Sequence, residues 1–150
     1  MLCILGSISI GGLGGLFTAQ EIPNWYASLK KPSFNPPNYL FGPVWTLLYF
    51  LMGISFYLIL KEKKSISHKT QSIISFVIQI TLNFFWSFIF FKNHAMGWAF
   101  IEMCVLWLSI VWMLVSFYRI NKVAAWLNVP YLVWVSFASI LNLTIYQLNN

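Results

Sequence analysis

Five long apolar stretches constrain the fold of this chain more than any other feature of its sequence. They cover residues 2–18, 40–60, 73–91, 97–118 and 124–148. Each supplies about 17–25 residues, which at ~1.5 Å per residue lets a helix cross a ~30 Å hydrocarbon core. Charged residues make up 8% of the chain and hydrophobic residues 59%, too few polar groups to cover a soluble fold. The sequence therefore predicts an all-α membrane protein, with five transmembrane helices in a single bundle that forms one domain over residues 1–150.

Two glycines on the first stretch favour close packing of helices. Gly11 and Gly15 stand four residues apart and so share one face of the expected helix. A face of small residues lets another helix approach closely within a membrane. That helix can belong to the same chain or to a second copy of it, so a homodimer stays open as one interpretation.

The segment 21–39 differs from the other joints because it is long, polar and rich in proline. Three of its prolines are expected to shape a lid: Pro32, Pro36 and Pro37. An earlier one, Pro23, can open a short helix in which Trp25, Tyr26 and Leu29 share an apolar side. Residues before proline avoid the α region, so the rest of the segment is extended or turned. We expect a lid over the bundle or, alternatively, an interfacial anchor built from Trp25 and Tyr26.

Basic residues are concentrated in two of the joints between the apolar stretches. Six of the nine Lys and Arg residues lie in the second and fourth joints: Lys61, Lys63, Lys64, Lys69, Arg119 and Lys122. By the positive-inside rule these joints face the cytoplasm, which places the N-terminus inside and the segment 21–39 outside. The net charge of +6 does not indicate a nucleic-acid partner, because no basic stripe accompanies a groove-reading element.

One face of the third stretch carries polar side chains at membrane depth. Gln79, Asn83 and Ser87 repeat every four residues, and Trp86 and Phe90 flank them. Lipid offers polar groups no partner, so this face points into the bundle. Its side chains either join helices to one another or contact a ligand, and the sequence leaves both interpretations open.

Aromatic side chains form two further stripes with the spacing of a helical face. Trp45 and Tyr49 stand four apart on the second stretch, and Trp134 and Ala138 follow Pro130 on the fifth. The proline is expected to kink that helix. Such stripes usually pack helices together, but several indoles beside an asparagine also suit a flat, aromatic, amphipathic ligand.

The sequence contains no constellation typical of hydrolytic catalysis or metal binding. The cysteine and histidine residues are scattered and lack the clustered partners of a metal site, so we expect neither a metal nor another cofactor. Glu102 is the only acidic residue within an apolar stretch, about one turn into the fourth. It is either a functional carboxylate or a solvated residue at a helix N-terminus.

A set of short motifs runs along the whole chain. It consists of Trp25-Tyr26 followed by Leu29, Lys31-Pro32-Ser33-Phe34, Pro36-Pro37, Phe41-Gly42-Pro43-Val44-Trp45-Thr46-Leu47-Leu48-Tyr49, Asn83, Trp86-Ser87, Ala125-Trp126-Leu127, Pro130-Tyr131, Trp134, Phe137-Ala138 and Asn142. In this order and spacing it resembles the translocator protein family, also called the tryptophan-rich sensory proteins (TspO/MBR), and a bacterial member of it. One departure concerns Tyr146, which no Lys or Arg follows, so the family's sterol-binding pattern is incomplete here.

The resemblance implies a five-helix bundle in a bacterial cell membrane, with a proline-rich loop over a cavity that binds porphyrins such as protoporphyrin IX. Carried over by motif, the ligand-binding residues are Tyr26, Trp45, Asn83, Trp86, Ser87, Phe90, Trp134 and Ala138. The protein would act as a sensor or carrier. Alternatively it degrades porphyrins in light, with Tyr26 and Trp134 as the redox pair. A third interpretation is a structural membrane scaffold whose aromatic residues only pack.

Overall fold

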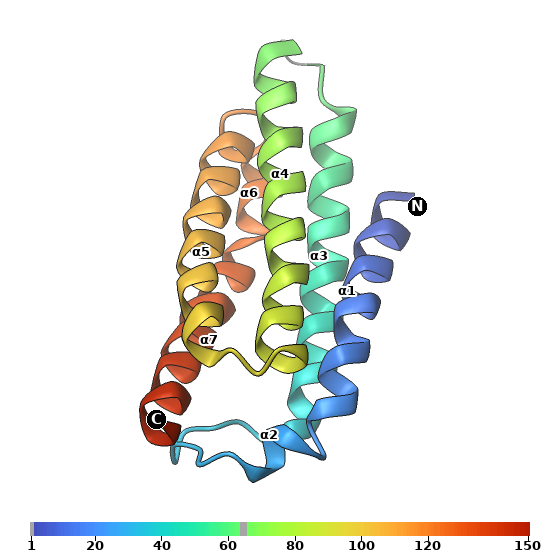
Figure 1. Cartoon of the computed structure of the whole chain (residues 1–150). Helices are drawn as coiled ribbons and strands as arrows, with labels where there is room; N and C mark the ends of the chain where they lie inside the picture. Colours follow the sequence, from blue (N-terminus) through green and yellow to red (C-terminus); the bar gives the residue numbers. More distant parts are fainter. Residues whose placement is uncertain (1, 64–65) are drawn as a thin grey trace.

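The computed structural model describes residues 2–63 and 66–150, and every regular element in that part of the chain is a helix (Figure 1). In chain order these are α1 (Leu2–Glu21), α2 (Trp25–Ser28), the 3-10 helix η1 (Asn38–Leu40), α3 (Phe41–Lys61), α4 (Ile66–Ser87), the π-helix η2 (Phe88–Lys92), α5 (Met96–Tyr118), α6 (Lys122–Trp126) and α7 (Val129–Asn149). The predicted all-α class is confirmed. Lys64, one of the basic residues used to predict orientation, lies outside the described residues.

The long helices run side by side, and their joints gather at two opposite ends of the bundle (Figure 1). The α3–α4 and α5–α6 joints lie at one end, where Asn121 Nδ2 donates to Glu62 Oε1 at 2.8 Å. Helix α2, the α4–α5 joint and the C-terminus lie at the other end. The two joints rich in Lys and Arg therefore share one end of the molecule, which is the arrangement that the positive-inside rule needs.

Four helical segments in the described part of the chain are long and apolar enough to cross a membrane. They are Asn38–Lys61, Ile66–Lys92, Met96–Tyr118 and Lys122–Asn149, with mean hydropathy between 1.5 and 2.1. Their outward sides carry exposed large apolar residues such as Leu108 and Val133, which suit lipid rather than water. The chain is thus an integral membrane protein. Helix α1 is 20 residues long but is not among these four segments, so a fifth span stays a prediction.

Helix α4 begins earlier than its apolar stretch and ends in a different geometry. It starts at Ile66, because an apolar run marks only the part of a helix that suits hydrocarbon. At its C-terminal end the chain widens into η2, where Asn93 N donates to Phe88 O at 3.1 Å. A π-turn adds a residue to the helical turn. It accompanies the burial of two adjacent rings, Phe90 and Phe91, which are 2% and 5% exposed.

The fifth apolar stretch forms two helices instead of the single kinked helix that was expected. Helix α6 ends at Trp126 and α7 begins at Val129. Pro130 stands in the first turn of α7, where its missing N–H costs no helical hydrogen bond. Asn128 occupies the break and is fully buried. Its Nδ2 donates to Ala124 O at 2.9 Å and also to the Ser55 hydroxyl on α3.

The polar stripe on α4 faces the interior, as its spacing predicts. Gln79, Asn83 and Ser87 are all buried. Glu102 on α5 is not solvated, because both of its carboxylate oxygens are buried, so the expectation of a solvated N-terminal residue is wrong. Neither oxygen has a hydrogen-bond partner among the described residues.

Glycines bring α1 against the rest of the bundle. A methyl group added at Gly11 would overlap the ring of Tyr49 on α3, and one added at Gly14 would lie 3.4 Å from Ser87 Oγ on α4. Close approach therefore depends on Gly11, as predicted. Gly15 plays no such part, because a methyl group there would meet nothing within 4 Å.

Candidate functional site

Two cavities lie next to the segment 21–39, and they differ greatly in volume. The larger, of about 410 Å³, lies between α1, α3 and α4. Gly11, Gly12 and Gly15 line it on the α1 side, so missing side chains create much of its space. The smaller, of about 30 Å³, lies among α2, α3, the C-terminal end of α4, η2 and α7. About one water molecule would fill the smaller cavity.

Two aromatic residues at the start of α3 form the wall between the cavities. Phe41 and Trp45 line both of them. The ring of Trp45 lies 5.8 Å from that of Tyr49 and 6.4 Å from that of Tyr131. The ring of Phe41 packs edge to face against Trp134 at 6.2 Å between centroids. These separations are typical of favourable aromatic pairs, so the wall is packed from both sides.

The predicted ligand-binding residues meet in one region but not in one cavity. The smaller cavity is lined by Tyr26, Trp45, Trp86, Phe90, Trp134 and Ala138. The larger is lined by Trp45, Asn83 and Ser87. Only Trp45 therefore reaches both. The lid prolines line neither cavity, whereas Asn38 and Tyr39, at the end of the same segment, line the larger one.

Two polar side chains on the wall of the larger cavity, Tyr49 and Asn83, belong to a buried hydrogen-bond network. The Tyr49 hydroxyl donates to Asn83 Oδ1, and Asn83 Nδ2 donates to the Tyr131 hydroxyl at 2.9 Å. All three side chains are buried. They come from α3, α4 and α7, so the network joins three helices at the inner side of the cavity. An amide has four hydrogen-bonding sites, and Asn83 therefore keeps capacity for a further partner.

The smaller cavity has the opposite character. Trp86 Nε1, Trp134 Nε1 and Asn142 Oδ1 are buried and have no hydrogen-bond partner among the described residues. All three belong to residues that line this cavity. It therefore combines two unpaired N–H donors with one unpaired acceptor. Buried polar groups are normally hydrogen-bonded, so each of these three atoms would gain from a partner such as a water molecule or a ligand atom.

Tyr26 joins the segment 21–39 to the smaller cavity. Its side chain is 2% exposed, and its hydroxyl donates to Asn35 Oδ1 at 2.7 Å. The ammonium of Lys31 lies 4.9 Å from the centre of its ring, a cation–π contact. Burial raises the pKa of Tyr26 to about 12. The phenol is thus neutral at physiological pH.

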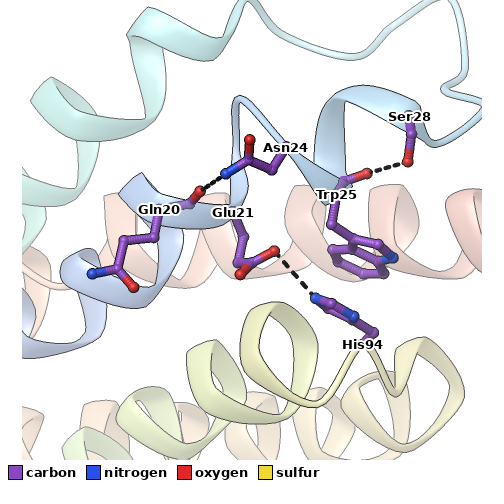
Figure 2. Close-up of polar contacts among 6 residues, drawn as sticks. All are labelled: Gln20, Glu21, Asn24, Trp25, Ser28 and His94. Atoms are coloured by element: carbon purple, nitrogen blue, oxygen red, sulfur yellow. Dashed lines mark hydrogen bonds and ion pairs between the residues drawn. The ribbon is translucent and has the colours of Figure 1, made fainter.

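A cluster of side chains fastens α2 to the α4–α5 joint (Figure 2). His94 Nε2 lies 3.2 Å from Glu21 Oε2 at the end of α1, and its ring stacks on Trp25 at 4.1 Å. Trp25 also packs edge to face on Phe90 at 5.5 Å. His94 has a φ of 55°, a left-handed conformation that non-glycine residues hold where surrounding contacts fix it. Here those contacts include Glu21 and Trp25.

The later part of the segment is fastened to α7. Lys30 N donates to Asn149 Oδ1 at 3.0 Å, and Asn149 Nδ2 donates back to Lys30 O at 2.9 Å. The ring of Phe34 packs edge to face against Phe137 at 6.4 Å. The segment is thus bonded to the bundle on both sides of Tyr26, the one of its residues that lines the smaller cavity.

Several residues at the site were not among the predicted ligand contacts. Asn142 was expected only as part of the family's motifs, and Tyr49 as part of those motifs and of an aromatic stripe. The unpaired oxygen of Asn142 has no signal in the sequence, because pairing depends on neighbouring helices. The glycine face of α1 does have one: Gly11, Gly12 and Gly15 lie within a short stretch. No group of three metal-ligating side chains occurs among the described residues.

The amino-acid sequence is similar to those of known proteins along nearly its whole length. The model of the TspO/MBR family matches residues 2–148. The tryptophan-rich protein TspO of Chlorobaculum tepidum is 40% identical over 99% of this chain and 94% of its own length. The protein of the same name from Archaeoglobus fulgidus is 41% identical over 97% of this chain and 94% of its own. The human translocator protein is 35% identical over 92% of this chain and 82% of its own.

Proposed function

The chain belongs to the TspO/MBR family, and from that premise we propose that it binds a tetrapyrrole of the protoporphyrin IX type in the membrane, as a sensor or carrier. The observation that carries the proposal is the pair of cavities separated by Phe41 and Trp45. One supplies space and the other supplies aromatic faces with unpaired polar atoms. A flat amphipathic ligand needs both.

Size supports the larger cavity as the place where the ligand enters. Its volume of about 410 Å³ lies within the range of about 300–1,000 Å³ that ligand pockets occupy. The smaller cavity cannot hold a tetrapyrrole with its present walls. We infer that Trp45 and Phe41 move when the ligand binds, which merges the two spaces. All eight predicted residues would then contact one ligand.

The polar atoms give the merged site its orientation. The two indole N–H groups of Trp86 and Trp134 are donors that a propionate or carbonyl oxygen of the ligand can accept from. Asn142 Oδ1 would accept from a pyrrole N–H or a protonated carboxyl. The rings of Trp45 and Trp134 offer stacking faces. The segment 21–39 would close over the ligand as a lid, shaped by Pro32, Pro36 and Pro37.

The membrane arrangement belongs to the same proposal. Helix α1 would cross as a fifth span, because it is as long as the others need to be and packs on α3 and α4. The basic end of the bundle would face the cytoplasm, which leaves the lid outside. Cysteine substitutions at Asn38 and at Ser65, a position outside the described residues, test this: labelling Ser65→Cys but not Asn38→Cys from outside intact cells contradicts it. Because Gly11 serves a contact within the chain, a homodimer has less support.

Light-dependent degradation of the porphyrin is a second candidate function. Tyr26 and Trp134 line the same cavity, and Phe41 packs edge to face on both at 6.2 Å. An excited porphyrin could oxidise either ring. The Tyr26 phenol donates its proton to an amide oxygen, which is a poor base, so the structure favours Trp134 as the residue oxidised first.

A titration followed by illumination tests these alternatives. Purified protein in lipid nanodiscs is titrated with protoporphyrin IX while tryptophan fluorescence is recorded. Saturable quenching near one ligand per chain is expected. Quenching that rises without saturation, as for a porphyrin dissolving in lipid, contradicts the proposal and leaves the scaffold interpretation. Illumination of the saturated complex then separates binding from degradation, since only an enzyme forms a product that Trp134→Phe suppresses.

A further inference from the structure

A groove lies at the basic end of the bundle, where the α5–α6 joint stands opposite the end that carries α2 (Figure 1). Its volume is about 330 Å³, and it runs between the end of α5 and the α6–α7 pair. Aliphatic residues such as Leu114 and Val129 line it, together with Tyr118, Arg119 and Trp126. The apolar groove therefore ends beside one guanidinium group and two aromatic side chains.

Two cations stand at this groove without a carboxylate partner. Arg119 lines it, and the Lys122 ammonium lies 5.5 Å from the centre of the Tyr118 ring. Neither forms an ion pair with an acidic side chain of the described residues. Glu62, the acidic residue at this end, instead accepts from Asn121 Nδ2 at 2.8 Å. The local positive charge is therefore left for a partner outside the chain.

The aromatic residues at the groove point outward rather than into the bundle. The side chain of Trp126 is 65% exposed and that of Tyr118 is 49% exposed. Amphipathic rings at the end of a membrane span lie at the level of the lipid headgroups. The groove therefore begins at headgroup depth, with its aliphatic wall directed toward the hydrocarbon.

We propose that this groove binds one anionic phospholipid, with its phosphate between Arg119 and Lys122 and an acyl chain along the aliphatic wall. A guanidinium suits a phosphate because two of its N–H groups can donate to two oxygens at once. A lipid suits the groove better than free phosphate does, because free phosphate would leave the aliphatic wall uncovered. This site is independent of porphyrin binding, because it shares no residue with either cavity.

The opposite end of α5 supplies a built-in control. A groove of about 540 Å³ there is lined by Trp98, which is 71% exposed, and by no Lys or Arg. It resembles the first groove in having an exposed indole beside apolar residues. It differs in charge. A lipid in this second groove should be held without regard to its headgroup.

Quenching by brominated lipids tests the proposal on the whole protein. The parent protein is placed in bilayers that mix phosphatidylcholine and phosphatidylglycerol, with bromine on the acyl chains of one lipid at a time. Trp126→Phe and Trp98→Phe variants identify the fluorescence of each indole by difference. At Trp126 we expect brominated phosphatidylglycerol to quench at a mole fraction about tenfold lower than brominated phosphatidylcholine does. At Trp98 the two lipids should quench equally.

Charge variants complete the test. Arg119→Gln with Lys122→Gln should abolish the preference at Trp126, and Lys92→Gln, at the other end of the bundle, should leave it intact. Arg119, Lys122 and Lys92 are all exposed, and saturable protoporphyrin IX binding confirms that the fold is kept in each variant. Equal quenching of Trp126 by both lipids in the parent overturns the proposal. So does competition by millimolar inorganic phosphate, which would mean that the site recognises phosphate alone.

Discussion

The two cavities beside Phe41 and Trp45 differ in what each of them lacks. The larger has room for a ligand, but Tyr49 and Asn83 on its wall are already bonded to each other, and Asn83 also to Tyr131. The smaller has unpaired indole N–H groups and an unpaired amide oxygen, but almost no space. The open space and the unpaired polar atoms thus lie on opposite sides of the Phe41 and Trp45 rings. The proposed binding of a tetrapyrrole therefore requires those rings to move.

Filling the larger cavity should have the largest effect. In Gly15→Phe the new ring enters open space, because a methyl group at Gly15 meets nothing within 4 Å. We expect protoporphyrin IX affinity to fall on the order of a hundredfold, ~2.7 kcal/mol, with little change in thermal stability. Gly6→Phe is the matched control, since Gly6 also has free space but lines neither cavity. Full affinity in Gly15→Phe would mean that the ligand does not use the larger cavity.

Removing an indole from the other side should cost somewhat less. Trp134→Ala deletes a stacking face and one unpaired donor, so affinity should fall about ten- to a hundredfold, or about 1–3 kcal/mol. Trp134→Phe keeps most of the volume and should lose less. If both variants bind protoporphyrin IX like the parent but unfold at a lower temperature, Trp134 only packs against neighbouring side chains and does not contact the ligand.

Asn83→Ala distinguishes contacts between helices from contacts to a ligand. It leaves the buried hydroxyls of Tyr49 and Tyr131 without their amide partner, so the free energy of unfolding should fall by about 1–3 kcal/mol. Adding Tyr131→Phe should cost less than the two separate losses together, because the pair shares one hydrogen bond. Thermal unfolding in nanodiscs measures both. A strictly additive double variant would contradict the network.

The lid over the smaller cavity should loosen at high pH. Burial raises the pKa of Tyr26 to about 12 from an ordinary value near 10, so the closed lid favours the neutral phenol. Its stabilisation is complete below about pH 10 and is lost progressively as the pH rises through 12. Porphyrin dissociation should therefore accelerate across that range. Tyr26→Phe should remove the acceleration, and its persistence in that variant would assign it to another group.

Backbone stiffness in the lid should have the smallest effect. Replacing Pro36 and Pro37 with glycine frees an extended stretch without touching either cavity, so the closed lid loses preorganisation. We expect dissociation of protoporphyrin IX to accelerate several-fold while its association rate stays nearly constant. Stopped-flow fluorescence measures both rates. Unchanged dissociation would remove the segment 21–39 from the binding mechanism.

The sequence predicts which side of each helix faces the interior, but not what that side contacts. Spacing of four residues was enough to turn Asn83 and Ser87 inward, because lipid excludes polar groups from the outer surface. The same spacing grouped Trp45 with Tyr49 on one helical face and Trp134 with Ala138 on another. It could not show that Trp45 stands between two cavities, since that depends on how α1, α3 and α7 cross and on the rotamer that the crossing allows.

Local irregularities limited the prediction in a second way. An apolar run does not reveal the π-turn at Phe90, because the run is equally apolar in either geometry. The break before Pro130 was expected only as a kink, because the bonds that satisfy it come from Asn128 to Ser55 on another helix. The family resemblance supplied most of the site, whereas the unpaired oxygen of Asn142 required the surrounding helices.

The break between α6 and α7 has a mechanical consequence. Trp134 lies about 9 Å along the helix axis from Asn128, and Asn149 lies about 32 Å from it, at ~1.5 Å per residue. If α7 pivots at that joint, it acts as a lever whose far arm is bonded to the backbone of Lys30. A sideways shift of about 1 Å at Trp134 would then carry its far end more than 3 Å. Motion of the Trp134 indole and motion of the segment 21–39 would then be coupled.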